Sequence, residues 1–313
     1  MRQLDFGWGV LVGIAGVAAA SCATRREPTP HALDAKDEAA WRTRLTEQRA
    51  ERDRELATSV TSPLAGVVRF APTAAAFLAI EGDAFVLADQ PGAATLVAFE
   101  PVDAARWTWR PTRAEVTAAS SGGKQLLAAG AVTEPTQLHL SDRFTAVAQM
   151  VSGALVVAGF DSKREDLVGF KQLTYFAPDP RFVVATKLER LASPTPIDLT
   201  TSRGLKKPFV RYAMLHFEVD GQPCTLTAFR SAGSTERGLF VPFRDATSGH
   251  DSYGAARFLD FDEPDGGEMK LDFNEAYNPL CAYSPAFNCP LPPVENQLTV
   301  AVAAGERAYS HGH

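Results

Sequence analysis

The chain has 313 residues, of which 45% are hydrophobic, and its formal net charge at pH 7 is -6. This length and composition are typical of a folded protein with one large or two small domains, and they exclude a disordered chain. The acidic balance argues against nucleic acid as a partner, because nucleic-acid-binding proteins carry a basic patch.

The N-terminus has the pattern of an export signal. Arg2 and the terminal amine precede an apolar run over residues 6–20, which is shorter than the roughly 20 apolar residues that a membrane-spanning helix needs. The run ends in Ala19-Ala20-Ser21-Cys22, and small residues directly before a cysteine resemble a bacterial lipoprotein cleavage site. We therefore expect residues 1–21 to be a signal peptide and Cys22 to carry lipid, which would anchor the protein in the cell envelope, facing the periplasm. Plain secretion and a retained anchor are the alternatives.

A polar tether and a helix follow the signal. Residues 22–36 contain two prolines and too few apolar residues to fold. Residues 37–58 contain no Gly or Pro, and Trp41 and Leu45 lie four residues apart, on one face of a helix. The interleaved charges of this stretch predict that the rest of the helix faces solvent.

Residues 60–163 predict a β domain. Short apolar runs, such as residues 76–81 and 95–100, alternate with breaks at Pro91-Gly92 and Ser152-Gly153. Many short strands with regular turns are typical of a sandwich or a barrel.

Residues 164–310 predict a second β domain. Phe182, Val184 and Leu188 take one face of an expected strand and Lys187 takes the other. Asp220-Gly221 is a strong signal for a two-residue hairpin turn. Further strands are expected at residues 239–243, 255–261, 269–273 and 297–303. The fold class is therefore mainly β, with two sandwich- or barrel-like domains preceded by an N-terminal helix.

Polar and aromatic residues are unusually dense between residues 240 and 306, and five prolines stiffen residues 278–293. The segment contains the runs Asp245-x-Thr247-Ser248-Gly249, Tyr253-Gly254-x-x-Arg257, Leu271-Asp272-Phe273-Asn274-x-Ala276-Tyr277-Asn278-Pro279, Cys281-Ala282-Tyr283, Cys289-Pro290-Leu291-Pro292-Pro293-x-x-Asn296 and Ala304-Gly305-Glu306. Together these runs resemble the signature of the domain of unknown function 1684 family. That family has no established activity, so the resemblance implies a domain and the region of a site, but no reaction. We call residues 240–306 the signature segment.

The signature segment contains the residue types that hold a small polar ligand. Tyr253, Arg257, Asp272 and Asn274 are expected to line one concave face, which would supply a cation, a phenol and a carboxylate. Asn278 and Asn296 join them as ligand-binding candidates. The alternative is that Arg257 and Asp272 form a buried ion pair and that the asparagines satisfy backbone groups of a proline-rich loop.

Three catalytic arrangements are weaker alternatives. Asp272 and Glu295, with Tyr253, form a candidate acid–base site. Ser248 with His250 or His216 is a candidate triad, although the chain has no Gly-x-Ser-x-Gly elbow. Cys281 is a candidate nucleophile that needs a base within reach. The histidines are scattered and the cysteines lack Cys-x2-Cys spacing, so neither a metal site nor a cofactor is expected.

Cys281 and Cys289 are expected to form a disulfide, because export leads to an oxidising compartment and the loop between them is short. Two packed thiols, a metal site and catalysis remain open for this pair. Taken together, the sequence predicts a lipid-anchored envelope protein that binds a small polar ligand or an envelope glycan in its C-terminal β domain. A hydrolytic enzyme and a structural protein without a ligand are the alternatives.

Overall fold

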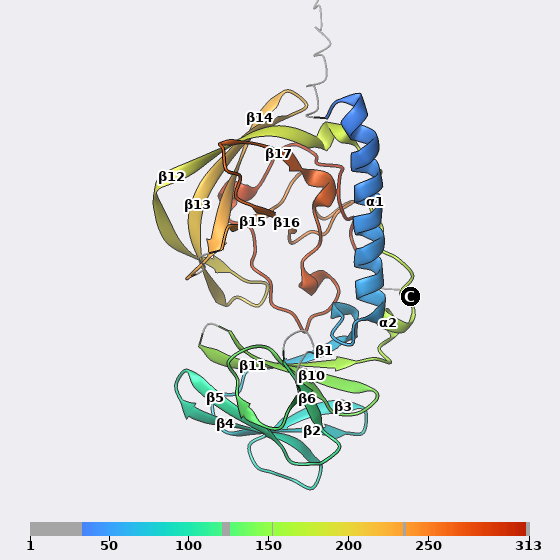
Figure 1. Ribbon diagram of the computed structural model, residues 1–313, viewed down its shortest axis with the longest axis vertical. Coiled ribbons are helices and arrows are strands. Elements are labelled where there is room, and N and C mark those ends of the chain that lie inside the picture. Colours follow the sequence, from blue (N-terminus) through green and yellow to red (C-terminus); the bar gives the residue numbers. More distant parts are fainter. Residues whose placement is uncertain (1–32, 121–125, 152, 234–235, 311–313) are drawn as a thin grey trace, which may run out of the picture.

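The computed structural model describes residues 33–120, 126–151, 153–233 and 236–310, and it shows two β lobes with a helix along one of them (Figure 1). The predicted fold class, mainly β with an N-terminal helix, is confirmed. The predicted signal peptide and its Cys22 lie outside the described residues, as does most of the tether.

The N-terminal lobe is a sandwich of two antiparallel sheets. Buried side chains of both sheets, among them Leu78, Phe99, Leu138 and Val157, form one apolar cluster between them. The first sheet has, in spatial order, β1 (Gly66–Phe70), β11 (Ala154–Asp161), β10 (Phe144–Val151), β9 (Thr136–His139), β6 (Thr117–Ala119) and β7 (Leu126–Leu127). The second has β3 (Ala84–Ala88), β2 (Ala76–Glu81), β4 (Thr95–Asp103), β5 (Arg106–Pro111) and β8 (Gly130–Ala131).

The C-terminal lobe is built on one curved antiparallel sheet, a half-barrel (Figure 1). The predicted hairpin turn joins two of its strands, and both turn residues have positive φ, 48° at Asp220 and 71° at Gly221. In spatial order the strands are β16 (Arg257–Asp262), β15 (Gly238–Phe243), β14 (Gln222–Ser231), β13 (Lys206–Val219), β12 (Val183–Thr200) and β17 (Glu268–Asp272).

The signature segment fills the inside of this half-barrel. Phe273 of the short helix η3 (Phe273–Glu275), together with Leu298, Val300 and Val302, packs in the same apolar cluster as the inner face of the sheet. The expected strand at residues 297–303 is wrong. This stretch pairs with the chain just after β15 through single hydrogen bonds, such as Ala246 N to Val300 O at 3.0 Å, and does not join the sheet.

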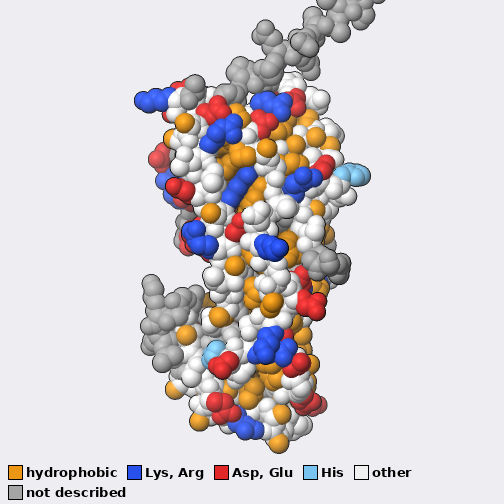
Figure 2. Space-filling view, turned by 90° about the vertical axis from the view of Figure 1, so that its right-hand side faces the viewer, with side chains coloured by type: hydrophobic (Ala, Val, Ile, Leu, Met, Phe, Trp, Pro, Cys, Tyr) orange, Lys and Arg blue, Asp and Glu red, His pale blue; other side chains and the backbone are white. Residues whose placement is uncertain are grey.

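Helix α1 (Ala35–Thr58) runs along the C-terminal lobe (Figure 1). Asp34 caps its N-terminus by accepting hydrogen bonds from the backbone N–H groups of Lys36 and Asp37. Trp41 and Leu45 pack on Val183 at the start of β12, as their spacing predicts. Figure 2 views this side and shows positive and negative side chains interspersed over the surface. Within the described part of the chain, no helix is both long and apolar enough to cross a membrane.

The remaining helical turns are short. They are η1 (Pro63–Ala65), α2 (Glu165–Val168), η2 (Pro180–Phe182), η4 (Leu280–Ala282) and η5 (Val294–Asn296). The turns η1 and α2 lie at the junction of the lobes, whereas η4 and η5 belong to the signature segment and position several of the candidate residues.

Candidate functional site

Arg257 is fully buried, and its side chain bonds to other buried segments of the C-terminal lobe. Its guanidinium lies 3.1 Å from Oδ1 of Asp245 and donates to the carbonyl of Val302 at 2.9 Å. Asp245 in turn accepts from the backbone N–H of Val302 at 2.7 Å. Burial lowers the pKa of Arg257, and Asp245 opposes that shift. The expected Arg257–Asp272 ion pair is therefore wrong in its partner, although a buried ion pair is present.

Asp272 and Asn274 fasten neighbouring segments to the end of β17. The indole N–H of Trp41 on α1 donates to Asp272, as does the backbone N–H of Asn274 at 2.8 Å. The side-chain amide of Asn274 exchanges two hydrogen bonds of 2.9 Å with the backbone of Asp179. Both residues thus hold α1 and the chain before β12 against the signature segment.

Asn278 and Asn296 satisfy backbone groups, as the alternative interpretation held. Asn296 is 0% exposed and bonds both the N–H and the carbonyl of Thr227 on β14. Asn278 donates from its backbone to Glu306 at 2.8 Å and from its amide to the carbonyl of Arg307 at 2.7 Å. Asp272 and Asn274 thus share one network, whereas Arg257, Asn278 and Asn296 bond elsewhere, and these predicted ligand-binding residues do not converge on one cavity.

Neither the acid–base site of Asp272 and Glu295 nor the triad of Ser248 and His216 is assembled. Glu295 pairs with Arg211 at the surface at 2.5 Å, whereas Asp272 accepts from the indole of Trp41 on α1. Ser248 donates to Asp245 at 3.1 Å, and His216 lies on β13, 3.6 Å from Glu189. No group of three or more His, Cys, Asp or Glu side chains suited to a metal occurs among the described residues.

A small cavity of about 160 Å³ lies beneath α1, between β16 and β17, where the half-barrel is open. Trp41, Asp260, Asp272 and Glu275 are among its lining residues. Burial raises the pKa of Asp260 and of Glu275, and Asp272 adds to the shift of Glu275. The space is well below the 300–1,000 Å³ of an ordinary ligand pocket, so we assign no substrate to it.

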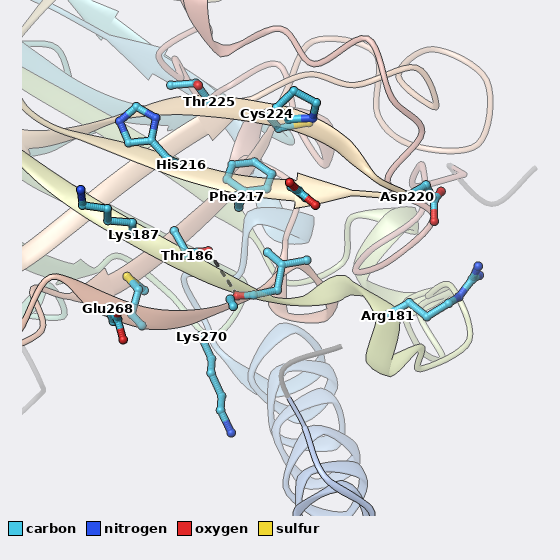
Figure 3. A pocket seen from close by; sticks show the side chains of 15 residues that line it. Arg181, Thr186, Lys187, His216, Phe217, Asp220, Cys224, Thr225, Glu268 and Lys270 are labelled. Carbon is cyan, nitrogen blue, oxygen red and sulfur yellow. Dashed lines mark hydrogen bonds between the residues drawn. The ribbon is translucent and has the colours of Figure 1, made fainter. Parts of the chain in front are cut away.

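A much larger cavity, about 940 Å³, lies where β12 separates from β13 (Figure 3). Pairing between these strands stops at Lys187 and His216. Beyond that pair, residues 183–186 of β12 pair only with β17, and residues 217–219 of β13 pair only with β14. The two strand pairs diverge and leave a wedge-shaped space, which we call the β12–β13 cleft.

The β12–β13 cleft combines charges of both signs with an apolar floor. Arg181 and Asp220 lie at its open end, whereas Lys187 and His216 lie where the strands rejoin (Figure 3). Further lining residues are Lys270, Glu268 and Glu218, with Val184, Phe217, Met269 and Cys224. The sequence predicted the polar face on which Lys187 lies, but gave no signal for the point at which strand pairing ends.

Tyr253, Cys281 and Cys289 form a third cluster. The backbone N–H of Cys281 lies 3.3 Å from the sulfur of Cys289, and the Tyr253 hydroxyl lies 3.9 Å from the sulfur of Cys281. Both cysteines are free thiols, in place of the expected disulfide. A hydrogen bond from Cys289 lowers the pKa of Cys281 to about 6, and the same contact raises the pKa of Cys289.

The chain is similar to an uncharacterised protein of known structure. An uncharacterised protein of Haloarcula marismortui, solved by solution NMR, is 45% identical over 46% of this chain and 80% of its own, with a TM-score of 0.40. No curated protein matches the chain. The family model described as protein of unknown function (DUF1684) matches residues 168–307. This match, over the C-terminal lobe, assigns that part of the chain to the DUF1684 family.

Proposed function

We propose that the protein is a cell-envelope lipoprotein that binds a small polar ligand or an envelope glycan in the β12–β13 cleft. The observation that carries the proposal is the early end of pairing between β12 and β13, which opens a cleft of about 940 Å³. That volume is near the upper end of the range for ligand pockets. The lipoprotein part rests on the small residues before Cys22.

The diverging strands supply backbone groups as well as side chains. The N–H of Leu188 donates to Gly267 at 2.6 Å, so the main-chain groups of even-numbered residues here face β17. Because successive residues of a strand face opposite neighbours, those of Ala185 face the β12–β13 cleft. On β13, His216 faces its partner Lys187 on β12. Glu218, two residues further along, faces the same way, so its backbone N–H and carbonyl point into the β12–β13 cleft. Hydroxyl and amide groups of a ligand fit such donors and acceptors.

The charges favour a ligand that carries hydroxyls or both signs of charge. Lys187 and His216 stand at the closed end, with Glu268 on the strand next to Lys187. Phe217 and Met269 offer an apolar surface for a sugar face or a methyl group. Fragments of an envelope glycan that bear short peptides combine these chemical features.

The test is isothermal titration of the full-length protein, in detergent, with soluble peptidoglycan fragments. We expect saturable binding to the parent protein. Lys187→Glu should lower the affinity about tenfold or more, because it removes one charge-assisted hydrogen bond to the ligand. The matched control is Lys171→Glu, an exposed lysine outside the β12–β13 cleft, which should bind like the parent.

Two results would contradict the proposal. Equal weakening by both variants would point to a general charge effect. Absence of binding to these fragments and to a panel of neutral oligosaccharides would favour the structural alternative.

A further inference from the structure

Cys281 and Cys289 are two neighbouring thiols that lie outside the β12–β13 cleft. Cys289 is 7% exposed, whereas Cys281, on η4, is half-buried and reaches solvent. The backbone N–H of Cys281 lies 3.3 Å from the sulfur of Cys289, which brings the two residues close together. An accessible thiol thus lies beside a hidden one.

The loop that carries these cysteines is tied to the far end of β12. The backbone N–H of Cys289 donates to the hydroxyl of Ser202 at 3.2 Å, and the N–H of Ser202 returns a bond to the Cys289 carbonyl at 2.8 Å. The next residue, Pro290, forms a bridge with Thr201. Cys289 is therefore fixed on the sheet, and the turn through η4 returns Cys281 to it.

The surroundings stabilise a negative charge on Cys281. The neighbouring Cys289 thiol is the largest cause of its lowered pKa. The Tyr253 hydroxyl lies between two acceptors of Cys281, 3.4 Å from its carbonyl and 3.9 Å from its sulfur, and also lowers the pKa. Burial raises the pKa of Tyr253, so its phenol stays protonated and remains a donor. Because its pKa is lowered and that of Cys289 is raised, Cys281 is the cysteine of the pair that loses its proton first. Burial raises the pKa of Cys224, the other described cysteine, which stays a thiol.

We infer that Cys281 and Cys289 form a thiol–disulfide exchange site, with Cys281 as the attacking thiol and Cys289 as the resolving thiol. Its substrates are disulfides, either small molecules or exposed disulfides of proteins. One thiol is accessible and the other is buried, and the backbone N–H of the first lies 3.3 Å from the sulfur of the second. Reactive cysteine pairs have this arrangement, with an exposed nucleophile and a resolving cysteine close to it.

The exchange proceeds in two displacements. The Cys281 thiolate attacks one sulfur of a disulfide R–S–S–R′, forms a mixed disulfide with R′ and releases R–S⁻. Cys289 then gives its proton to R–S⁻ and attacks the Cys281 sulfur, which closes the Cys281–Cys289 bond and releases R′–S⁻. The leaving R′–S⁻ takes a proton from solvent. Two electrons pass from the protein to the substrate, which leaves as two thiols.

Oxidised glutathione tests this with the reduced, full-length protein. Samples are quenched by alkylation at intervals, and each cysteine is followed by peptide mass spectrometry. At pH 7 we expect Cys281 to react about tenfold faster than Cys224, because the thiolate is the nucleophile and Cys281 has the lower pKa. The difference is no larger because a thiolate of lower pKa is also less nucleophilic. The parent should end as a Cys281–Cys289 disulfide.

Variants separate the two roles. Cys289→Ser should stop at a glutathione adduct on Cys281, and Cys281→Ser should lose the fast reaction. Cys224→Ser is the matched control and should behave like the parent. Tyr253→Phe should shift the pH midpoint of Cys281 alkylation upward, which a merely structural role for the phenol would not do.

Two results would overturn the inference. One is a Cys281 in the parent that reacts no faster than Cys224. The other is a glutathione adduct on the parent that persists without closing to the disulfide. Both are measured on the unaltered chain, so they decide the question even where a variant fails to fold.

Discussion

Arg257 lies at 0% exposure among the segments that fill the half-barrel. It stands at the start of β16, opposite Phe243 in the register with β15, so Asp245, two residues beyond Phe243, falls within its reach. Its other acceptors are backbone carbonyls, such as that of Val302. A single ion pair therefore fixes a strand, a turn and an irregular segment at once.

Replacing Arg257 by Ala should lower the free energy of unfolding by about 3–5 kcal/mol, because it leaves the Asp245 carboxylate buried without a compensating charge. Urea denaturation followed by tryptophan fluorescence measures the change. The matched control is Arg307→Ala, which removes an exposed arginine paired with Asp251 and should cost about 1 kcal/mol or less. Equal costs for the two variants would show that the buried pair does not stabilise the fold as described.

The sequence indicated that Arg257 is paired, but not with which carboxylate. Asp245 and Asp272 both stand in the signature and lie at similar distances along the chain. The choice is made by the sheet, since β17 pairs with β12 on the edge opposite to β16. The partner of Arg257 therefore depends on the order of the strands in the sheet, which cannot be read from the residues of one segment.

At the scale of elements, α1 is more than a helix with a solvated charged face. Two of its arginines point inward: Arg49 donates to the carbonyl of Phe176 at 3.1 Å, and Arg52 pairs with Glu306. Glu306 is 1% exposed and also accepts from the Tyr283 hydroxyl at 2.6 Å. The interleaved charges predicted a solvated face because spacing alone does not separate an inward arginine from an outward one.

Removal of the Arg52 side chain should loosen α1. Arg52→Ala leaves the Glu306 carboxylate buried without its cation, and we expect a loss of about 3–5 kcal/mol of stability. Arg54→Ala is the control on the same helix, because Arg54 forms an exposed pair with Glu51 and should cost about 1 kcal/mol or less. Thermal unfolding, with limited proteolysis of α1 as a second readout, compares them. If Arg54→Ala proves as costly as Arg52→Ala, the inward ion pair is not what holds the helix.

Strands and turns were more predictable than the spaces between them. Alternation of apolar residues and the Asp220-Gly221 turn predicted the β13–β14 hairpin, because both signals are local. Residues 297–303 carry a similar alternation, yet they lie inside the half-barrel, where Asp245 and Arg257 provide their partners. The β12–β13 cleft had no local signal, since it arises where two strands stop pairing.

At the scale of the whole molecule, the loop between Cys281 and Cys289 also closes the junction of the lobes. The Ser284 hydroxyl donates to the carbonyl of Gly66 on β1 at 2.7 Å. A side chain at Gly66 would meet the Phe287 ring at 2.8 Å, so the backbone of the N-terminal lobe approaches as closely as a glycine allows. The thiols of the proposed exchange site and the contacts between the lobes therefore belong to one loop.

The lipid anchor is a prediction about the whole chain and its place in the cell. Cys22→Ala should leave the protein unprocessed or release it from membranes, because each methylene of an attached acyl chain contributes about 0.8 kcal/mol of membrane affinity. Detergent-phase partitioning of the mature protein, with mass spectrometry of its N-terminal peptide, measures both outcomes. Cys224→Ala removes a cysteine of the C-terminal lobe and should partition like the parent. A Cys22→Ala chain that is processed and membrane-bound like the parent would show that residues 1–22 are not a lipoprotein signal. The proposed location in the cell envelope would then lose its support. The proposed ligand binding in the β12–β13 cleft would not be affected, because it rests on the strand pairing.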